Sequence, residues 1–289
     1  MISVICFSKS RPLQLHAYIE SLITYSGIPQ ESIAILYKET EEVSYELVMD
    51  SFPNVVWAKE YAFNADLLRL VHNANELILW GCDDVVYKSE FDTDACEKAF
   101  EDPDMMGFTL RQGRNLSGFD AWLKPVSCED GVIIWDRRQC VTYAWEVSAT
   151  IYRKQDILDL LYAGVYIDDW ASKEIQRAIG KVYPERSLVP TIELITGPNM
   201  LEWVIFYWHG SIDTTFRTRM RMACFEFSKS VSFSVNRVQE VAPNVYDDRG
   251  TDIDNLYKAY VAGKRLNWRA LDGWANLHTH ENSIMFEVM

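Results

Sequence analysis

Two adjacent carboxylates follow an apolar segment near residue 80. The segment Leu77–Trp80 is followed by Gly81 and Cys82, and then by Asp83 and Asp84. An apolar strand that ends in carboxylates places them at its carboxyl end, which is the edge of an open α/β sheet where ligands bind. Two carboxylates there are suited to hold a divalent cation, and the cation is suited to hold a diphosphate. The alternative is that Asp83 and Asp84 only cap a turn after a buried strand.

The acidic pair indicates an enzyme that handles a nucleotide-activated small molecule, above all a sugar. The chain of 289 residues contains 10 Trp, 15 Tyr and 13 Phe. Sugar sites favour aromatic side chains because a flat ring covers the C–H face of a pyranose. Aromatic side chains also dominate ordinary cores, and we expect most of these to be core residues.

The net charge excludes one class of partner. The formal charge is −14 at pH 7, whereas nucleic-acid phosphates require clusters of Lys and Arg. We therefore expect no nucleic-acid partner and no general attraction to anionic membranes. An anionic nucleotide substrate would need a metal ion or a local basic cluster to offset this charge.

The cysteines and the apolar runs indicate the compartment. The six cysteines form no C-x-x-C pair and are irregularly spaced, which is typical of free thiols in a reducing compartment. The N-terminal residues lack the pattern of a secretory signal. No apolar run approaches the roughly 18–20 residues of a membrane span. We expect a cytoplasmic protein with no transmembrane segment, at most attached peripherally to a membrane.

The elements that position the acidic pair begin almost at residue 1. Ile2–Phe7 is predicted to be a strand and Ser8–Arg11 a polar loop. Pro12 suits the first turn of a helix, and apolar residues recur at helical spacing until Gly27 ends it. A strand followed by a helix on one face is the unit from which parallel sheets are built.

The same alternation continues to the acidic pair. Ile33–Tyr37 and Val55–Trp57 are predicted strands, and a helix capped by Asn64 precedes the strand Leu77–Trp80. This order predicts a parallel sheet with right-handed crossovers. Neither a G-x-G-x-x-G nor a Walker loop follows the first strand. Some other device, such as a metal ion, must then hold the phosphates.

The rest of the chain is mixed. Met106–Arg111 is predicted to be a strand that leads into a turn, and Ser148–Tyr152 a strand followed by a helix. Ser230–Val235 alternates polar and apolar residues as a half-exposed strand does. Asp254–Ala262 is predicted to be a helix that ends at Gly263.

Four short segments carry a resemblance to a known family. Phe7–Leu13, Asn64–Arg69, Cys82–Asp84 and Ile151–Lys154 occur in the order and spacing of the GT-A glycosyltransferases, loosely the large inverting family two group. The chain resembles that family well over residues 1–90 and fairly as far as Lys154. The third segment falls where the family carries its D-x-D or D-D-D signature.

The resemblance implies both a fold and an activity. The fold would be a GT-A-type α/β nucleotide-binding domain with a mixed, mostly parallel sheet flanked by helices. Residues 1–110 would bind the nucleotide sugar and 111–215 the acceptor, with 216–289 an α+β C-terminal extension packed on the same domain. A sugar would pass, with inversion, from a UDP-, GDP- or TDP-linked donor to a hydroxyl of a glycan, lipid-linked or protein acceptor. The cofactor would be Mn²⁺ or Mg²⁺.

The chain departs from the family at the first position of the acidic signature, which is Cys82. If the pattern holds otherwise, Asp83 lies near the ribose or sugar of the donor and Asp84 is the metal ligand. One protein carboxylate is enough where diphosphate oxygens and water complete the shell, as is usual for Mg²⁺. Some GT-A enzymes add a C-terminal histidine to that shell, which implies His280 or His278 here.

Further donor contacts are expected at the same edge of the sheet. Lys9 and Arg11 lie in the loop where the family contacts base and ribose, although a solvated basic turn is the alternative. Arg69 could face the diphosphate or could only pair with Asp66 three residues earlier. Arg111 and Asn115 could touch donor or acceptor, or could only form a hairpin. The full set of expected donor contacts is Phe7, Ser8, Lys9, Arg11, Tyr37, Asp66, Arg69, Asp83, Asp84 and Arg111.

The catalytic base is expected to be a carboxylate that removes the proton of the acceptor hydroxyl. The family keeps an acidic pair at a helix start after the acceptor site, which implies Asp169 or its neighbour Asp168. Both also suit the first turn of a helix for structural reasons alone. Glu146, in an aromatic segment, is a rival.

Two other functions remain open. A sugar-phosphate nucleotidyltransferase has a similar core, but it opens with a glycine-rich loop, and Ser8–Arg11 contains no glycine. A non-catalytic module that binds a glycan or a protein on the same scaffold is favoured by Cys82. That module would bind an acceptor without turning over a nucleotide sugar.

Overall fold

A large twisted sheet forms the centre of the protein. The computed structural model describes residues 1–119, 124–136, 147–165, 219–233, 235, 252–281 and 288–289. Within these residues, nine strands form the main sheet, and a second sheet of three strands lies beside it. The order of strands is β3-β2-β1-β4-β9-β6-β10-β8-β7 in the main sheet and β12-β11-β5 in the small one.

The first half of the main sheet is parallel, as the sequence predicts. β1 (Ile2–Lys9) lies between β2 (Ile33–Lys38) and β4 (Leu77–Cys82), and β3 (Val56–Lys59) follows on the outer side of β2. Since these four strands run the same way, their carboxyl ends meet at one edge. The predicted α/β class, with a mostly parallel sheet flanked by helices, is confirmed.

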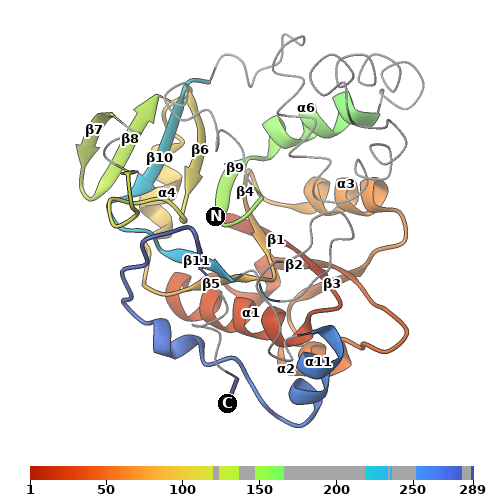
Figure 1. Ribbon diagram of the computed structural model, residues 1–289. Helices are drawn as coiled ribbons and strands as arrows, with labels where there is room; N and C mark the ends of the chain where they lie inside the picture. Colours follow the sequence, from red (N-terminus) through yellow and green to blue (C-terminus); the bar gives the residue numbers. More distant parts are fainter. Residues whose placement is uncertain (120–123, 137–146, 166–218, 234, 236–251, 282–287) are drawn as a thin grey trace, which may run out of the picture.

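Helices cover both faces of this half (Figure 1). α1 (Pro12–Ser26) packs on one face together with α2 (Glu46–Ser51) and α11 (Ile253–Val261). α3 (Phe63–Asn73) and α6 (Lys154–Val165) lie together on the other face. The predicted start of α1 at Pro12 and its end at Gly27 are confirmed, and Gly27 adopts a left-handed φ of 65°.

The second half of the main sheet contains antiparallel pairs. β9 (Thr150–Arg153) is antiparallel to both β4 and β6 (Met105–Thr109). β10 (Arg221–Phe225) is parallel to β6 and antiparallel to β8 (Val132–Asp136). The remaining elements are β5 (Val85–Tyr87), α4 (Thr93–Ala99), β7 (Pro125–Glu129), β11 (Ser230–Phe233), β12 (His280–Glu281) and the short 3-10 helices Gln30–Ser32 and Trp268–Leu271.

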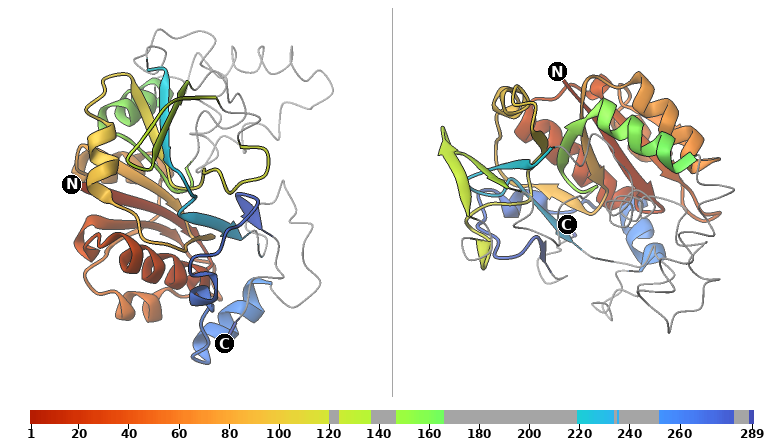
Figure 2. Two further views of the ribbon diagram at one scale, coloured as in Figure 1. Left: turned by 90° about the vertical axis from the view of Figure 1, so that its left-hand side faces the viewer. Right: turned by 90° about the horizontal axis from the view of Figure 1, so that it is seen from above.

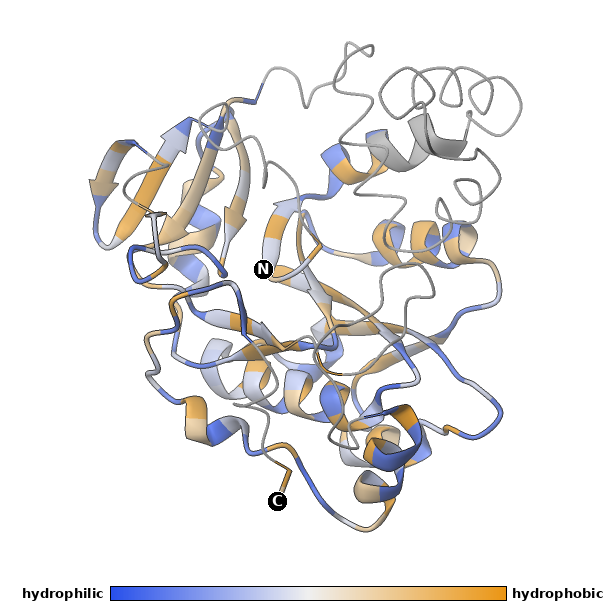
Figure 3. Cartoon of the chain, viewed as in Figure 1, coloured by the Kyte–Doolittle hydropathy of each residue, from blue (hydrophilic) through white to orange (hydrophobic). Residues whose placement is uncertain are grey.

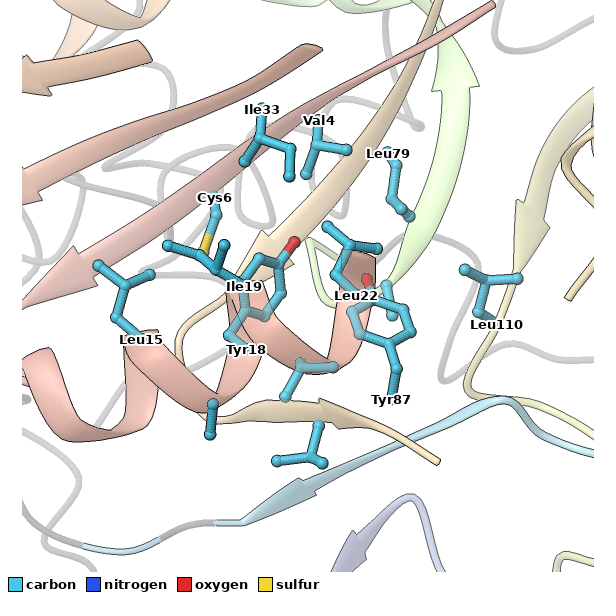
Figure 4. Packing of buried hydrophobic residues seen from close by; sticks show 14 of the residues in the cluster. Val4, Cys6, Leu15, Tyr18, Ile19, Leu22, Ile33, Leu79, Tyr87 and Leu110 are labelled. Atoms are coloured by element: carbon cyan, nitrogen blue, oxygen red, sulfur yellow. The ribbon is translucent and has the colours of Figure 1, made fainter. Parts of the chain in front are cut away.

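Two apolar layers lie on the two faces of the parallel half. Alternate residues of β1 point to opposite faces, so Val4 and Cys6 face α1 whereas Ile5 and Phe7 face α3. The α1 side is shown in Figure 4, where Tyr18 and Tyr87 lie close together. Figure 3 shows orange apolar residues along the strands and both orange and blue residues on α3 and α11, as helices with one buried face require.

The C-terminal residues are part of both sheets. β10 lies between β6 and β8 in the main sheet, and β11 joins β5 to β12. The extension expected over 216–289 therefore supplies strands to the central structure in addition to packing on it (Figure 2). The boundary at 215 itself lies outside the described residues.

Two local predictions are wrong. α3 begins at Phe63 after the N-cap Ala62, so Asn64 does not cap it. The strand β11 is buried along its whole length, Ser230–Phe233, and is not half-exposed. It is buried because it is the central strand of the small sheet, a position that its alternating sequence does not reveal. No helix among the parts of the chain that the structure describes is both long and apolar enough to cross a bilayer.

Candidate functional site

The acidic pair lies where the sequence predicts, in the turn between β4 and β5. Tyr18 of α1 packs against the backbone of Gly81, at a place where a Cβ atom on residue 81 would overlap the phenol ring. The ring of Tyr18 also meets that of Tyr87 edge-on, with centroids 5.7 Å apart. Gly81 therefore allows α1 to approach β4 directly beneath the acidic turn.

Asp83 is buried, and both of its carboxylate oxygens have partners inside the protein. Its side chain is enclosed, with a residue exposure of 1%. One carboxylate oxygen forms an ion pair with the Arg11 guanidinium, and the other accepts a hydrogen bond of 2.7 Å from the Ser8 hydroxyl. The backbone N–H of Asp83 donates to the carbonyl of Phe7 at 3.1 Å. Asp83 thus joins the β4–β5 turn to the end of β1 and to the start of α1.

A tyrosine that the sequence analysis did not single out completes this group. The Tyr45 hydroxyl, at the N-cap of α2, lies 2.6 Å from the Ser8 hydroxyl and accepts a hydrogen bond of 3.1 Å from the Arg11 backbone N–H. We call Ser8, Arg11, Tyr45 and Asp83 the Asp83 network. It joins three segments of the chain that are far apart in the sequence, namely the loop Ser8–Arg11, the start of α2 and the β4–β5 turn.

The loop inside this network has an unusual backbone. Ser10 is buried and has a φ of 54°, in the left-handed region that non-glycine residues rarely adopt. Such a residue costs of the order of 1–3 kcal/mol and persists where the surroundings hold it. Its N–H donates to the Lys38 carbonyl of β2 at 3.0 Å.

Burial dominates the electrostatics of the network. Burial raises the pKa of Asp83 to about 6, although the guanidinium of Arg11 and the hydroxyl of Ser8 act in the opposite direction. Burial alone would lower the pKa of Arg11, but the carboxylates of Asp83 and Asp84 outweigh it and raise that pKa. Burial also raises the pKa of Tyr45. Above pH 6 the network therefore consists of an ion pair and two neutral hydroxyls.

Asp84 differs from its neighbour. Its side chain is half-buried and makes no hydrogen bond or ion pair to the parts of the chain that the structure describes. Its backbone carbonyl accepts a hydrogen bond of 2.8 Å from the N–H of Phe233 in β11. Of the two aspartates, Asp84 is the one whose carboxylate is available to a ligand.

Two of the expected donor contacts lie mainly in the core. Phe7 is 6% exposed, and its ring stacks on Trp80 at 5.5 Å and touches Phe63 at 5.7 Å. Tyr37 is 9% exposed, and its ring lies 5.0 Å from that of Tyr45. Both side chains support the sheet edge from within. Lys9, the last residue of β1, is exposed at that edge.

Asp66 and Arg69 lie on α3, near the same edge. One oxygen of Asp66 accepts hydrogen bonds from the N–H groups of Tyr61 and Ala62, at 2.8 and 2.9 Å. These two bonds hold the pKa of Asp66 below its ordinary value. The other oxygen pairs with Arg69 at 3.3 Å. Asp66 thus stabilises the start of α3, and its pairing with Arg69 is the structural alternative that the sequence left open.

Arg111 and His280 meet on the other flank of the acidic turn. The guanidinium of Arg111, at the end of β6, lies 3.3 Å from Nδ1 of His280. In the small sheet, His280 pairs with Ser232, and Ser232 pairs with Val85, the residue after the acidic pair. Because neighbouring strands lie about 4.8 Å apart, the backbone of His280 lies about 10 Å from that of Val85.

The side chains at this edge suit a cation whose coordination shell is completed by a substrate. No group of three or more His, Cys, Asp or Glu side chains is placed to hold a metal ion within the described residues. Mg²⁺ is usually held by one or two carboxylates together with substrate phosphates and water. Asp84 fits that arrangement, whereas Asp83 is already paired with Arg11.

Asn115, expected near donor or acceptor, is engaged inside the protein. Its amide donates to the Ser228 hydroxyl at 2.9 Å and to the Asn276 carbonyl at 2.7 Å. The Ser228 hydroxyl donates to Oδ1 of Asn276 at 3.0 Å, and the Lys88 ammonium donates to the Ser228 carbonyl at 2.6 Å. We call Lys88, Asn115, Ser228 and Asn276 the Asn276 network. It fixes the segment that carries His280.

The residues expected to act as catalytic base, Asp168, Asp169 and Glu146, lie outside the described residues. Their role therefore stays a prediction. The two networks, by contrast, contain residues that sequence reasoning missed. Tyr45 and Asn276 belong to no motif, and the only available signal was the general preference of buried polar groups for hydrogen-bond partners.

Comparison with known proteins supports the resemblance. No known family profile matches the chain. The chain is similar to the "Bifunctional glycosyltransferase pgtA" of Dictyostelium discoideum, with 25% identity over 306 residues that include 92% of this chain. The match includes 36% of that protein, so the chain spans about a third of the length of this curated relative. The resemblance to glycosyltransferases is thus confirmed, and the similarity extends beyond the segments that suggested it, over nearly the whole chain.

Solved structures give weaker matches. The match to the crystal structure of S. aureus TarS has a TM-score of 0.38 and 13% sequence identity. It covers 55% of this chain and 29% of the TarS chain. The match to mannosyltransferase PcManGT from Pyrobaculum calidifontis, in complex with GDP-Man and Mn²⁺, has a TM-score of 0.36 and 9% sequence identity. It covers 55% of this chain and 46% of the PcManGT chain. TM-scores this low carry no argument about the function of this chain. The sequence relative is the comparison that bears on it: the chain is similar over nearly all its length to part of a glycosyltransferase.

Proposed function

We propose that the chain is a glycosyltransferase domain that takes a nucleotide sugar as donor. The observation that carries this proposal is that Asp84 and Arg11 follow the carboxyl ends of the parallel strands β4 and β1 and lie close enough for their charges to interact. The Asp84 carboxylate has no hydrogen-bond or ion-pair partner among the described residues, and such a carboxylate near a guanidinium, in a chain of net charge −14, suits a diphosphate bound with a cation. The sequence similarity to a glycosyltransferase favours a sugar as the group carried.

In this proposal the nucleotide lies over the ends of β1 and β2, against the loop Ser8–Arg11. Lys9 would approach a phosphate or the ribose, and Tyr37 would support the floor of the site. Asp84 would hold Mn²⁺ or Mg²⁺, with His280 as the candidate for a further ligand. When bound, the cation would neutralise the charge that develops on the diphosphate leaving group.

The proposed transfer is a single displacement. The acceptor oxygen forms a bond to the anomeric carbon as the bond from that carbon to the diphosphate breaks, which inverts the anomeric configuration. The proton of the acceptor hydroxyl passes to a carboxylate, for which Asp169 is the first candidate and Asp168 and Glu146 are the others. Arg111, whose guanidinium lies beside His280, would orient the sugar or the acceptor.

A thermal-shift screen tests the donor site. The protein is heated with UDP, GDP, TDP or CMP, each with Mn²⁺, Mg²⁺ or EDTA. A nucleotide that binds only the folded state raises the midpoint by an amount that grows with ln(1 + [L]/Kd). We expect one nucleotide to raise it, only with metal, and Asp84→Asn to abolish the shift. Asp50→Asn, the same change on the exposed surface of α2, is the matched control.

A non-catalytic binding module is the second candidate. It is favoured by Cys82 at the first acidic position and by the burial of Asp83, which leave a single available carboxylate in the motif. Radiolabelled nucleotide sugars distinguish the two. Release of nucleoside diphosphate in the presence of acceptor glycans supports the transferase, whereas glycan binding without any release supports the module. No shift with any nucleotide would remove the donor site altogether.

A further inference from the structure

We propose that Asp83 is a positioning residue, which fixes the loop Ser8–Arg11 in the backbone conformation that receives the nucleotide and does not itself contact the nucleotide sugar. This inference rests on the proposed function, because it assigns a role within the same donor site. It also differs from the role that the resemblance implies for Asp83, which is a direct contact to the ribose or sugar.

The enclosure of the carboxylate is the first argument. Asp83 is 1% exposed, and its two oxygens are directed to Arg11 and to Ser8. A ribose hydroxyl would have to displace one of these partners to reach it. The displaced partner would then lose a charge-assisted hydrogen bond inside the protein, which is among the stronger bonds that side chains form.

The backbone of the loop is the second argument. Ser10 holds a left-handed φ of 54° between the two residues that Asp83 binds. Strained backbone of this kind persists only where the surrounding contacts determine it. The contacts on the two sides of Ser10 are the bonds from Ser8 and Arg11 to Asp83, and the bond from the Ser10 N–H to β2.

The way in which the network is closed is the third argument. The Tyr45 hydroxyl contacts the Ser8 hydroxyl and accepts from the N–H of Arg11, so both ends of the loop are held twice. Removing the Asp83 carboxylate would leave the Arg11 guanidinium buried without its counter-ion, since its side chain is 11% exposed. We expect the guanidinium to turn outward and the loop to lose its fixed conformation.

A double-variant series measured on the full chain tests the proposal. Kd for the nucleotide that shifts the wild type is measured by calorimetry with Mn²⁺ for Asp83→Asn, Arg11→Met and the double variant. We expect Asp83→Asn to raise Kd about 10- to 100-fold, because a displacement of about 1 Å in a binding group has effects of that size. In the Arg11→Met background the same change should alter Kd less than about twofold, since Asp83 acts through Arg11.

Hydrogen exchange, measured without any ligand, supplies a readout that a direct contact would not change. We expect the peptide that contains residues 8–13 to exchange faster in Asp83→Asn than in the wild type. The peptide that contains β2 is the internal reference for global unfolding, and the increase in residues 8–13 should be larger than any increase in β2. Asp84→Asn is the matched control: it should weaken nucleotide binding while the exchange of residues 8–13 stays unchanged.

Two results would overturn the proposal. One is a rise in Kd for Asp83→Asn that is equally large with and without Arg11, which would show a direct contact to the ligand. The other is wild-type exchange of residues 8–13 in Asp83→Asn. If the wild type binds no nucleotide, the proposed function fails, and the exchange result then decides by itself whether Asp83 positions the loop.

Discussion

The Asp83 network and the Asn276 network perform the same structural task with different chemistry. Each joins segments that are distant in the sequence. The Asp83 network is built on an ion pair, between Arg11 and Asp83, that is almost entirely enclosed. The Asn276 network is built on neutral amide and hydroxyl groups, with the Lys88 ammonium bound to a carbonyl at its edge.

This difference in chemistry predicts how each network responds to the loss of one side chain. Removing one partner of a buried ion pair leaves an uncompensated charge, which is strongly destabilising. Removing one member of a neutral network leaves polar groups that lose a hydrogen bond, which costs less. The loop Ser8–Arg11 should therefore lose its conformation when a single residue changes, whereas the C-terminal segment should become only slightly less stable.

The largest expected effect is that of Arg11→Met on stability. The variant leaves the Asp83 carboxylate buried without its counter-ion, and we expect the free energy of unfolding to fall by about 3–5 kcal/mol. Urea unfolding, followed by tryptophan fluorescence, measures it. The double variant Arg11→Met/Asp83→Leu should recover much of the loss, since an apolar pair can replace a buried ion pair.

Arg269→Met is the matched control for that prediction. Arg269 pairs with Glu20 at 3.0 Å, but the two side chains are 62% and 37% exposed. Exposed pairs are worth about 0–1 kcal/mol, so the same substitution should have little effect there. Similar losses for Arg11→Met and Arg269→Met would contradict the contrast between a buried and an exposed pair.

A titration extends the comparison to the contact between the helices α1 and α11. His16 of α1 lies 3.0 Å from the Tyr260 hydroxyl of α11, and its ring packs against Phe52. Burial and the nearby Arg265 lower the pKa of His16 to about 4, with Glu20 acting in the opposite direction.

The sign of the effect follows from this lowered pKa. The unfolded chain takes up a proton on His16 near pH 6.5, whereas the folded chain does so only near pH 4. Stability is therefore complete above pH 6.5 and falls as the pH drops from there towards 4, by up to about 3 kcal/mol. The difference between the wild type and His16→Gln, measured by urea unfolding at several pH values, isolates this residue. A difference that does not change between pH 7 and pH 4 would argue against a neutral, buried imidazole.

Asn276→Ala tests the neutral network. The change removes the amide that accepts from Ser228 at 3.0 Å and donates to the His278 carbonyl at 2.7 Å. We expect a loss of about 1–3 kcal/mol, since buried polar groups lose partners. Amide exchange should increase in residues 272–281 and stay unchanged in residues 8–13. Asn54→Ala, in an exposed turn, is the control and should change neither. Equal exchange in both segments would show that the two networks are not independent.

The parallel half of the fold was predictable from the sequence because its signals are local. Apolar runs, Pro12 and Gly27 mark the first strand and helix, and each segment buries its own apolar face. The placement of Asp83 and Asp84 after β4 followed from the same pattern. The pattern did not show that Asp83 would be buried and Asp84 available. The pairing of Asp83 with Arg11 depends on the register that sets Phe7 opposite Cys82.

The second half was less predictable because its contacts are not local. β10 enters the main sheet between β6 and β8, and nothing in Arg221–Phe225 specifies those neighbours. Asn115 and Asn276 meet across 161 residues of sequence. A polar residue that forms such a contact looks like any surface residue in the sequence. The sequence therefore suggested a ligand-binding role for Asn115, whose hydrogen bonds are in fact directed inside the protein.

The smallest expected effect comes from removing a hydroxyl group from one of two tyrosines whose rings are in contact. Tyr45→Phe removes the hydroxyl that binds Ser8 and the Arg11 N–H, and we expect it to lower the free energy of unfolding by about 1–2 kcal/mol. Tyr37→Phe removes a hydroxyl at the exposed end of a ring that is otherwise buried, and it should cost less than about 0.5 kcal/mol. Both variants keep the packing of the rings, 5.0 Å apart, so the difference between them measures the hydroxyl of Tyr45 alone. Urea unfolding of the two variants side by side gives that difference. If the two losses are equal, Tyr45 contributes only its ring, and the loop Ser8–Arg11 is held by the ion pair without help from the phenol hydroxyl.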